Sequence, residues 1–147
     1  MKMSKEDIEK RPRIVLIVRG ILENDKGELL LIKRSDKDSW KPGFWEFPGG
    51  KLDPGQDVYI AFEREVLEET GLSVKPIKPL FFVDSYINPR YKYPGLPFVM
   101  IIGKGIVSGG KITLSDDHSD FKWLKPEEAL KLDITPETKK ALPVFYS

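Results

Sequence analysis

Several runs of apolar residues that are typical of β-strands recur along this chain. Residues 13–22 and 28–34 are rich in Ile, Val and Leu, and the Asn-Asp-Lys-Gly sequence between them predicts a hairpin turn. The apolar run 98–107 predicts a further strand that turns at 108–110. Shorter strands are expected at 44–47, 72–83, 111–114 and 121–124, and prolines interrupt the second of these.

One central segment instead has the period of a helix. It begins after Asp57, a suitable N-cap, and ends at Gly71, where a left-handed C-terminal cap is expected. The glycine-rich stretch 49–55 before it is expected to be a loop. Helices are also predicted at 126–132 and 135–142, each with a proline in its first turn. Strands on both sides of one central helix predict mixed α/β layers.

Residues 1–147 are expected to form a single domain, because a chain of this length can bury a substantial core. Residues 1–12 are polar, and we expect them to be frayed or to form a short helix around 6–10. The connection 84–97 is rich in proline and tyrosine and is long for a compact domain. Connections of that length are often functional.

The central helix carries an unusual arrangement of charge. Glu65, Glu68 and Glu69 have i, i+3, i+4 spacing, so they share one face and continue the apolar face of the first turns. Two of them lie in the last turn, where the helix dipole disfavours negative charge. Clustered carboxylates become favourable around a hard divalent cation. The alternative is a solvated acidic helix with Arg64 and Lys51 as ion-pair partners.

Charge and composition limit the classes of binding partner that we expect for this protein. The formal net charge is +1, so no global basic field attracts a nucleic acid polymer. There is no cysteine for disulfides or thiolate metal sites, and no apolar run approaches the ~20 residues of a membrane span. We therefore expect a cytoplasmic protein, monomeric or homodimeric, with a small-molecule ligand and no membrane partner.

The segment from Gly50 to Leu72 resembles the Nudix box, written G-x5-E-x7-R-E-U-x-E-E-x-G-U with U an aliphatic residue. Gly50, the Arg64-Glu65-Val66 run, the Glu68-Glu69 pair and Gly71-Leu72 all stand in register. One position departs, since the first glutamate of the pattern is Gln56 here. Glutamine keeps an acceptor oxygen but lacks the charge, so we expect Gln56 to weaken metal binding and slow turnover without abolishing either.

This resemblance implies a Nudix fold, an α/β/α sandwich around a mixed central β-sheet. It also implies that Mg²⁺, with Mn²⁺ as the alternative, is bound by the carbonyl of Gly49 and by the carboxylates of Glu65, Glu68 and Glu69. Arg64 is implied to orient the neighbouring glutamates by ion pairing. Among these residues Glu65, Glu68 and Arg64 are the expected catalytic group.

Further site residues are expected outside the helix. Arg34 resembles the family's phosphate-contacting basic residue, with Lys33 as its competitor and a plain surface role as the alternative. Gly50 and Lys51 are expected to contact substrate. Asp117 lies a few positions before a tryptophan, as the extra metal ligand or general base does in many relatives.

The acidic stretch around Asp117 has a second interpretation. Asp116 and Asp120 are further candidates for the same role, and the whole stretch could equally be a solvated turn. His118 is the single histidine. A histidine there could assist proton transfer, but we expect it to be an ordinary loop residue.

The resemblance implies an enzyme, a hydrolase acting on phosphorus-containing acid anhydrides. The leading expectation is a Mg²⁺-dependent, MutT-like pyrophosphohydrolase that cleaves nucleoside triphosphates, within a family that cleaves nucleoside diphosphates linked to another group. One alternative is an ADP-ribose or nucleoside-diphosphate-sugar pyrophosphatase. Such relatives often carry a proline at a fixed distance past the box, and Pro89 lies close to that spacing but not at it. The other alternative, a non-catalytic nucleotide-binding module, is supported by Gln56 alone.

Overall fold

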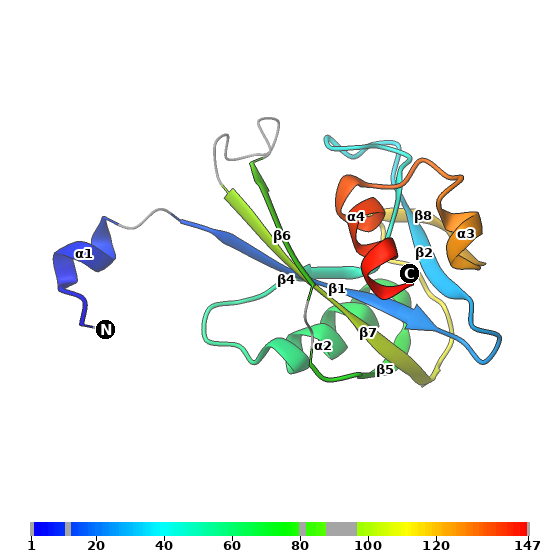
Figure 1. Cartoon of the computed structure of the whole chain (residues 1–147), viewed down its shortest axis with the longest axis horizontal. Coiled ribbons are helices and arrows are strands. Elements are labelled where there is room, and N and C mark those ends of the chain that lie inside the picture. The colour runs from blue at the N-terminus through cyan, green and yellow to red at the C-terminus, as the bar shows by residue number, and fades with distance from the viewer. Residues whose placement is uncertain (1, 11–12, 80–81, 88–96, 147) are drawn as a thin grey trace.

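The computed structural model describes residues 2–10, 13–79, 82–87 and 97–146. Its main body is one eight-stranded sheet with helices on both faces, and α1 stands apart near the N-terminus (Figure 1). In chain order the elements are α1 (Lys5–Glu9), β1 (Val15–Glu23), β2 (Leu29–Arg34), β3 (Trp45–Glu46), β4 (Gly49–Lys51), α2 (Val58–Thr70), β5 (Leu72–Pro76), β6 (Phe82–Ile87), β7 (Pro97–Gly110), β8 (His118–Leu124), α3 (Pro126–Ala129) and α4 (Pro136–Phe145).

The sheet is mixed, as predicted. Its strand order is β3-β2-β1-β7-β5, with β4 paired to β1, β6 to β7 and β8 to β2. The central strands β1 and β7 are parallel, and the other pairs are antiparallel. No helix in the described part of the chain is both long and apolar enough to span a membrane.

Two hydrophobic cores flank the sheet. Successive apolar residues of β2 point to opposite faces, so Leu30 and Ile32 join the core under α2 whereas Leu29 and Leu31 join the core on the other face. The first core includes Phe62 of α2, and the second includes residues of α3 and α4. This confirms the α/β/α sandwich (Figure 1).

The central helix begins and ends where the sequence predicts. Asp57 Oδ1 accepts hydrogen bonds from the backbone N–H groups of Tyr59 and Ile60, at 2.9 and 3.1 Å. Gly71 takes the left-handed conformation with φ 76°, and its N–H donates to the carbonyl of Leu67. The short helix expected near the N-terminus is α1.

Several expected boundaries are wrong because the backbone finds partners that are distant in sequence. The stretch expected as a loop at 49–55 begins as strand β4, which pairs with β1. The segment 111–114 is not a strand, because the N–H of Thr113 bonds to the carbonyl of Thr70 at the end of α2. The β7 strand continues through Gly110 by pairing with β5, and β8 already begins at His118.

The other differences concern the connections and the last helices. The connection expected over 84–97 starts later, because residues 82–87 form β6. Its residues 88–96, including Pro89, lie outside the described residues. Helix α3 ends at Ala129, and α4 extends to Phe145 although Pro143 lies inside it.

Phe62 sets the distance between α2 and the sheet. Its ring lies on Gly20 of β1 and Gly105 of β7. A Cβ atom added at Gly20 would lie 2.8 Å from Phe62 Cζ, and one at Gly105 would lie 2.9 Å from Phe62 Cε1. These two glycines therefore let the helix approach the two central strands closely.

We expect Gly20→Ala to lower the free energy of unfolding by about 1–3 kcal/mol, because the methyl group overpacks against the Phe62 ring. Denaturant unfolding measures the change. Gly109→Ala on β7 is the control, since a Cβ there meets nothing within 4 Å. If the two variants lose equal stability, backbone effects explain the loss, and overpacking against the Phe62 ring does not.

Candidate active site

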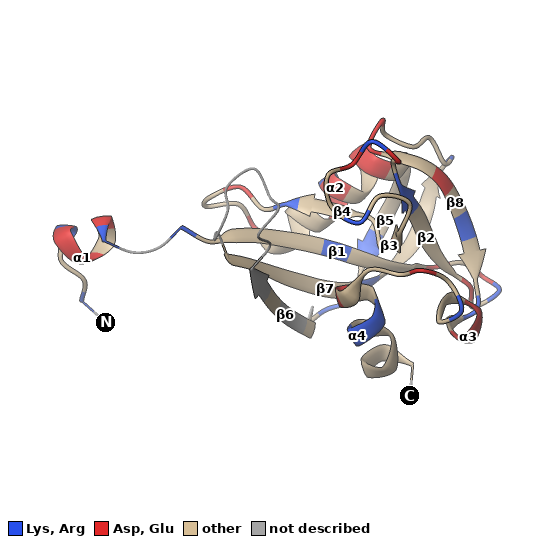
Figure 2. Cartoon of the chain, turned by 90° about the horizontal axis from the view of Figure 1, so that it is seen from above, with Lys and Arg blue, Asp and Glu red and all other residues tan. Residues whose placement is uncertain are grey.

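The glycines of β4 lie directly against the carboxylates of α2. A Cβ atom added at Gly50 would lie 2.0 Å from Glu65 Oε2, so the carboxylate occupies the space beside the backbone. The N–H of Gly49 lies 3.4 Å from Glu69 Oε2, and a Cβ at Gly49 would collide with the carbonyl of Val18 at 1.9 Å. Figure 2 shows the acidic residues of α2 on the same side of the molecule as β4.

Arg64 holds one of these carboxylates in place. Its Nη2 is 2.8 Å from Glu65 Oε1, and its Nη1 is 3.2 Å from Asp53 Oδ2 in the loop after β4. Its Nε is 3.8 Å from Glu68 Oε1. Because Arg64 occupies Oε1 of Glu65, the oxygen that faces Gly50 is Oε2.

The three box glutamates differ in exposure. The side chains of Glu65 and Glu69 are 15% and 16% exposed, whereas that of Glu68 is 61% exposed. Within the described residues, no three His, Asp or Glu side chains converge on one point. A cation shared by the three would therefore need the exposed side chain of Glu68 to turn toward the other two.

The pKa shifts of Glu65 and Glu69, the two less exposed box glutamates, fit the binding of a hard cation. Burial raises the pKa of Glu69 to about 7, although the charges of His118 and Arg19 act in the opposite direction. Burial also raises the pKa of Glu65, opposed by the hydrogen bond from Arg64 and assisted by the charge of Glu68. Both carboxyl groups have raised pKa values despite these positively charged neighbours, and their oxygens are the ligands that Mg²⁺ prefers.

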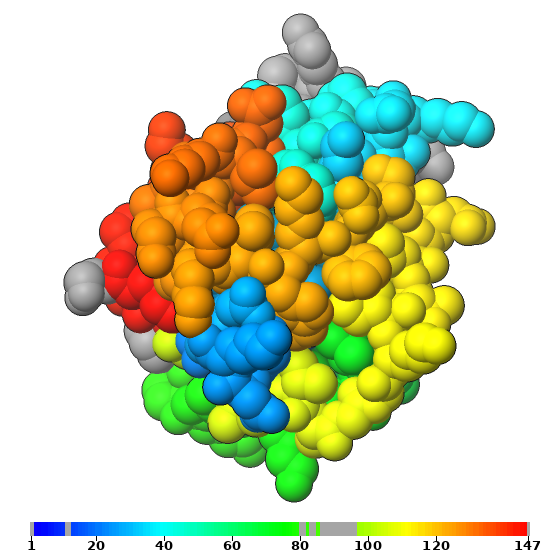
Figure 3. Space-filling view, turned by 90° about the vertical axis from the view of Figure 1, so that its right-hand side faces the viewer, coloured from blue at the N-terminus to red at the C-terminus, as the bar shows by residue number. Residues whose placement is uncertain are grey.

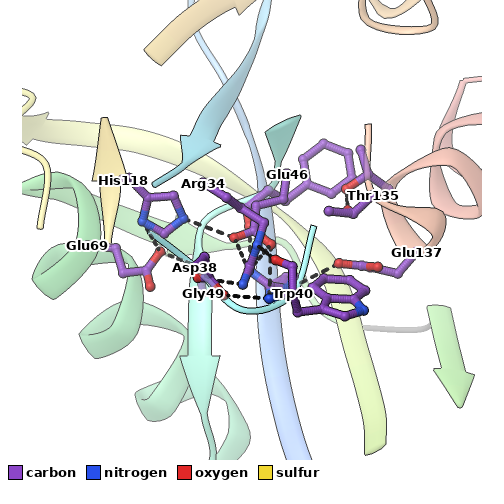
Figure 4. A network of polar contacts seen from close by, with 12 residues as sticks. Arg34, Asp38, Trp40, Glu46, Gly49, Glu69, His118, Thr135 and Glu137 are labelled. Carbon is purple, nitrogen blue, oxygen red and sulfur yellow. Dashed lines mark hydrogen bonds and ion pairs between the residues drawn. The ribbon is translucent and has the colours of Figure 1, made fainter. Parts of the chain in front are cut away.

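Behind these carboxylates lies a buried polar network centred on Glu46 (Figure 4). Glu46 is 1% exposed. Its Oε1 is 3.2 Å from Arg19 Nη2 and 3.0 Å from Arg34 Nη1, and its Oε2 is 2.9 Å from His118 Nε2. Burial alone would raise the pKa of Glu46, but the charge of Arg19, the hydrogen bond from His118 and the charge of Arg34 together lower it to about 2.

His118 is not the ordinary loop residue that we expected. It begins β8, is 8% exposed, and its Nδ1 lies 3.7 Å from Glu69 Oε2. The ring therefore stands between a carboxylate of the Nudix box and Glu46. Its burial could not be predicted locally, since Glu46 is 72 residues away along the chain.

Glu137 and Arg19 complete the network and were also missed. Glu137 lies in the first turn of α4, is 1% exposed, and its Oε1 is 3.7 Å from Arg19 Nε (Figure 4). Burial raises the pKa of Glu137, and the charge of Arg19 opposes this. In the sequence, a glutamate after a proline indicates only a favourable charge at a helix start.

Arg34 is closely engaged with the protein itself. Its Nη2 is 2.6 Å from Asp38 Oδ2, its Nε donates to the carbonyl of Trp40 at 2.8 Å, and its Nη1 binds Glu46. The guanidinium also lies 4.9 Å from the centre of the Trp40 ring. A role of Arg34 in binding phosphate remains a prediction, as does substrate contact by Gly50 and by Lys51, which is exposed at the end of β4.

Asp117 lies in an exposed turn just before β8. The Asp117 carbonyl accepts a hydrogen bond from the N–H of Ser35 at 2.9 Å, and the N–H of Ser115 bonds to the carbonyl of Glu69. The first bond links the acidic turn to the segment after β2, and the second links it to the last turn of α2. Figure 3 shows the neighbouring surface, with β8 and α3 in orange and the segment after β7 in yellow. A metal or base role for Asp117 stays a prediction.

Gln56 shapes the loop that carries Asp53. Its Oε1 lies 3.2 Å from the N–H of Asp53, and its own N–H donates to the carbonyl of Asp53 at 3.1 Å. A glutamate could accept the same bond from Asp53. The loop geometry therefore does not require the amide.

We expect Gln56→Glu to strengthen Mg²⁺ binding and raise turnover, because it supplies the negative charge of the family pattern in the loop whose Asp53 contacts Arg64. The Mg²⁺ concentration that gives half-maximal activity is the measurement. Unchanged Mg²⁺ dependence and rate would show that residue 56 does not belong to the metal environment of this protein.

Comparison with known proteins agrees with this geometry. Residues 13–145 match the family model of the NUDIX domain. The nucleoside triphosphatase NudI of Escherichia fergusonii is 30% identical over 131 residues, which cover 86% of this chain and 92% of that protein.

Solved structures show the same fold. The MutT protein from Methanosarcina mazei Go1 has a TM-score of 0.74 at 26% identity, covering 90% of this chain and 91% of that one. The MutT Nudix hydrolase from Burkholderia pseudomallei has a TM-score of 0.73 at 27% identity, covering 89% and 97%. The expected fold and family are confirmed. This chain belongs to the Nudix family and is a MutT-like hydrolase that acts on phosphoanhydride bonds.

Proposed function

We propose that this protein is a Mg²⁺-dependent pyrophosphohydrolase of nucleoside triphosphates, with Mn²⁺ as an alternative cation. The observation that carries the proposal is the packing of Glu65 and Glu69, two carboxylates with raised pKa values, against the glycines of β4. The name of the relative NudI, a nucleoside triphosphatase, supports this choice of substrate.

In this proposal Glu65 both binds the cation and accepts a proton, and each of the other residues has one task. Glu65, Glu68, Glu69 and the carbonyl of Gly49 hold the cation, which when bound neutralises phosphate oxygens and acidifies water. Arg64 fixes Glu65 through Oε1, so that Oε2 is placed beside Gly50 to accept the proton of the attacking water. The water oxygen bonds to one phosphorus of the α–β phosphoanhydride as the bridging P–O bond breaks, and the bridging oxygen leaves on the departing group, which is pyrophosphate or the nucleoside monophosphate.

The products test the proposal. A panel of nucleoside triphosphates, ADP-ribose and nucleoside-diphosphate sugars is incubated with Mg²⁺, and the products are separated. Pyrophosphate with a nucleoside monophosphate is the expected result. Two monophosphates from a diphosphate-linked substrate would instead assign the protein to the ADP-ribose or sugar-nucleotide class.

A nucleotide-binding protein without activity is the second candidate. Gln56, in place of the first glutamate of the box, favours it. Nucleotide binding measured by calorimetry, together with no product from any member of the panel in Mg²⁺ or Mn²⁺, would support this candidate and overturn the hydrolase.

A further inference from the structure

His118 connects two carboxylates that come from different parts of the fold. Its Nε2 lies 2.9 Å from Glu46 Oε2 on β3, and its Nδ1 lies 3.7 Å from Glu69 Oε2 on α2. The side chain of His118 is 4% exposed. Figure 4 shows the ring between Glu69 on one side and the Glu46 network on the other.

On the Glu46 side of the His118 ring, the carboxylate is held by several side chains. Arg19 and Arg34 contact Glu46 Oε1 at 3.2 and 3.0 Å, and Arg34 Nη1 also donates to Oε2 at 3.1 Å, the oxygen that His118 contacts. An ionised carboxylate can only accept hydrogen bonds, so the Nε2 of His118 must be the donor in this pair. That bond fixes the orientation of the ring and turns Nδ1 toward Glu69.

The Glu69 side is held at one oxygen. In the part of the chain that the structure describes, the polar contacts of the Glu69 side chain both use Oε2, one with Gly49 N–H at 3.4 Å and one with His118 Nδ1. Oε1 is left for another ligand. The 3.7 Å separation exceeds a hydrogen bond, so the ring lies beside the carboxylate without bonding to it.

We propose that His118 is a positioning residue that holds Glu69 in the orientation needed to bind the divalent cation, with Glu46 and the two arginines as its support. The inference rests on the proposed cation-dependent function. Groups that orient metal ligands in this way commonly change metal affinity by about 10- to 100-fold when they are removed. The competing explanation is that His118 only provides a partner for buried Glu46 and so serves stability.

Two substitutions separate these explanations, because each retains one end of the imidazole. In His118→Gln the longer side chain can place its amide near the position of Nε2, so the bond to Glu46 is kept and the group facing Glu69 is lost. In His118→Asn the amide lies near the position of Nδ1, so the reverse applies. Mn²⁺ binding to the nucleotide-free protein is measured by electron paramagnetic resonance, and thermal unfolding is measured alongside.

We expect His118→Gln to melt close to the wild-type protein but to bind Mn²⁺ about 10- to 100-fold more weakly. His118→Asn should bind Mn²⁺ more tightly than His118→Gln while melting at a lower temperature. With Mg²⁺, the activation constant for the metal should rise in His118→Gln, and the KM for nucleotide should stay unchanged.

Mn²⁺ binding by His118→Gln at the wild-type affinity, or tighter than by His118→Asn, would overturn the role of His118 and leave a purely structural one. If His118→Gln does not fold, a His118→Asn protein that keeps its Mn²⁺ affinity within about tenfold supports the proposal, and a larger loss overturns it. A wild-type protein that neither binds Mn²⁺ nor hydrolyses nucleotides would instead overturn the proposed function and this inference with it.

Discussion

Replacing Glu65 with glutamine is expected to lower kcat by about 10²- to 10⁴-fold, the range typical for loss of a group that accepts a proton in the transition state. Glutamine has nearly the same shape, so it can still lie against Gly50 and meet Arg64. It cannot take up the proton of the attacking water, and it is a weaker ligand for a cation. Steady-state hydrolysis of the preferred nucleotide at saturating Mg²⁺ measures the effect.

The matched control is Glu63→Gln, on the same helix two residues earlier. Glu63 is exposed and has no role in the proposed site, so kcat should stay at the wild-type value. A Glu65→Gln protein that retains more than about a tenth of the wild-type kcat would exclude Glu65 as the proton acceptor, and Asp117 would become the next candidate to test.

The part of this site that the sequence predicts is the part built from local interactions. The spacing of Glu65, Glu68 and Glu69 on one helix face follows from helix geometry alone, and Asp57 and Gly71 limit the helix through bonds to its own backbone. Resemblance to the Nudix box then supplied the chemical interpretation. Neither step needed the rest of the fold.

What the sequence could not predict depends on contacts between distant segments. The local sequence predicts a loop at Gly49 and Gly50, because it carries no sign of their pairing with Arg19 and Val18 of β1. The burial of His118 depends on Glu46, which is far away in the chain. Polar residues are normally predicted at the surface, so a pattern of hydrophobicity does not predict a buried network of polar side chains.

That network also explains how a carboxylate with a raised pKa and one with a lowered pKa coexist on the two sides of the His118 ring. Glu46 is buried and Glu69 is partly buried, and burial raises the pKa of each. Glu46 receives two arginines and His118 directly, whereas Glu69 receives a backbone N–H and a more distant ring. The positively charged side chains therefore stabilise the ionised form of Glu46. Glu69 has weaker compensation, so a bound cation would stabilise its ionised form.

Glu46→Gln is accordingly expected to destabilise the fold by about 3–5 kcal/mol, because it removes the buried carboxylate that Arg19 and Arg34 share and leaves each arginine with one other carboxylate, Glu137 or Asp38. The pKa of Glu46 gives a similar magnitude. A decrease from 4.5 to about 2 corresponds to about 3 kcal/mol of stabilisation. Urea unfolding of the metal-free proteins at neutral pH measures the loss, and exposed Glu63→Gln should stay within about 0.5 kcal/mol of wild type.

The pH dependence of this difference identifies its cause. Because folding lowers the pKa of Glu46, its contribution to the free energy of unfolding is fully present above the unfolded value of 4.5 and is lost as pH falls through about 2.

Glu69 and Glu137, whose pKa values folding raises, contribute stability below their unfolded pKa values and lose that contribution as pH rises. Glu69 and Glu137 are present in wild type and in Glu46→Gln, so most of their effect cancels when the two free energies of unfolding are subtracted. The gap between wild type and Glu46→Gln should therefore be constant from pH 7 to about 5 and shrink toward pH 2. A gap that stays constant down to pH 2 would mean that lost packing, not lost charge, destabilises the variant.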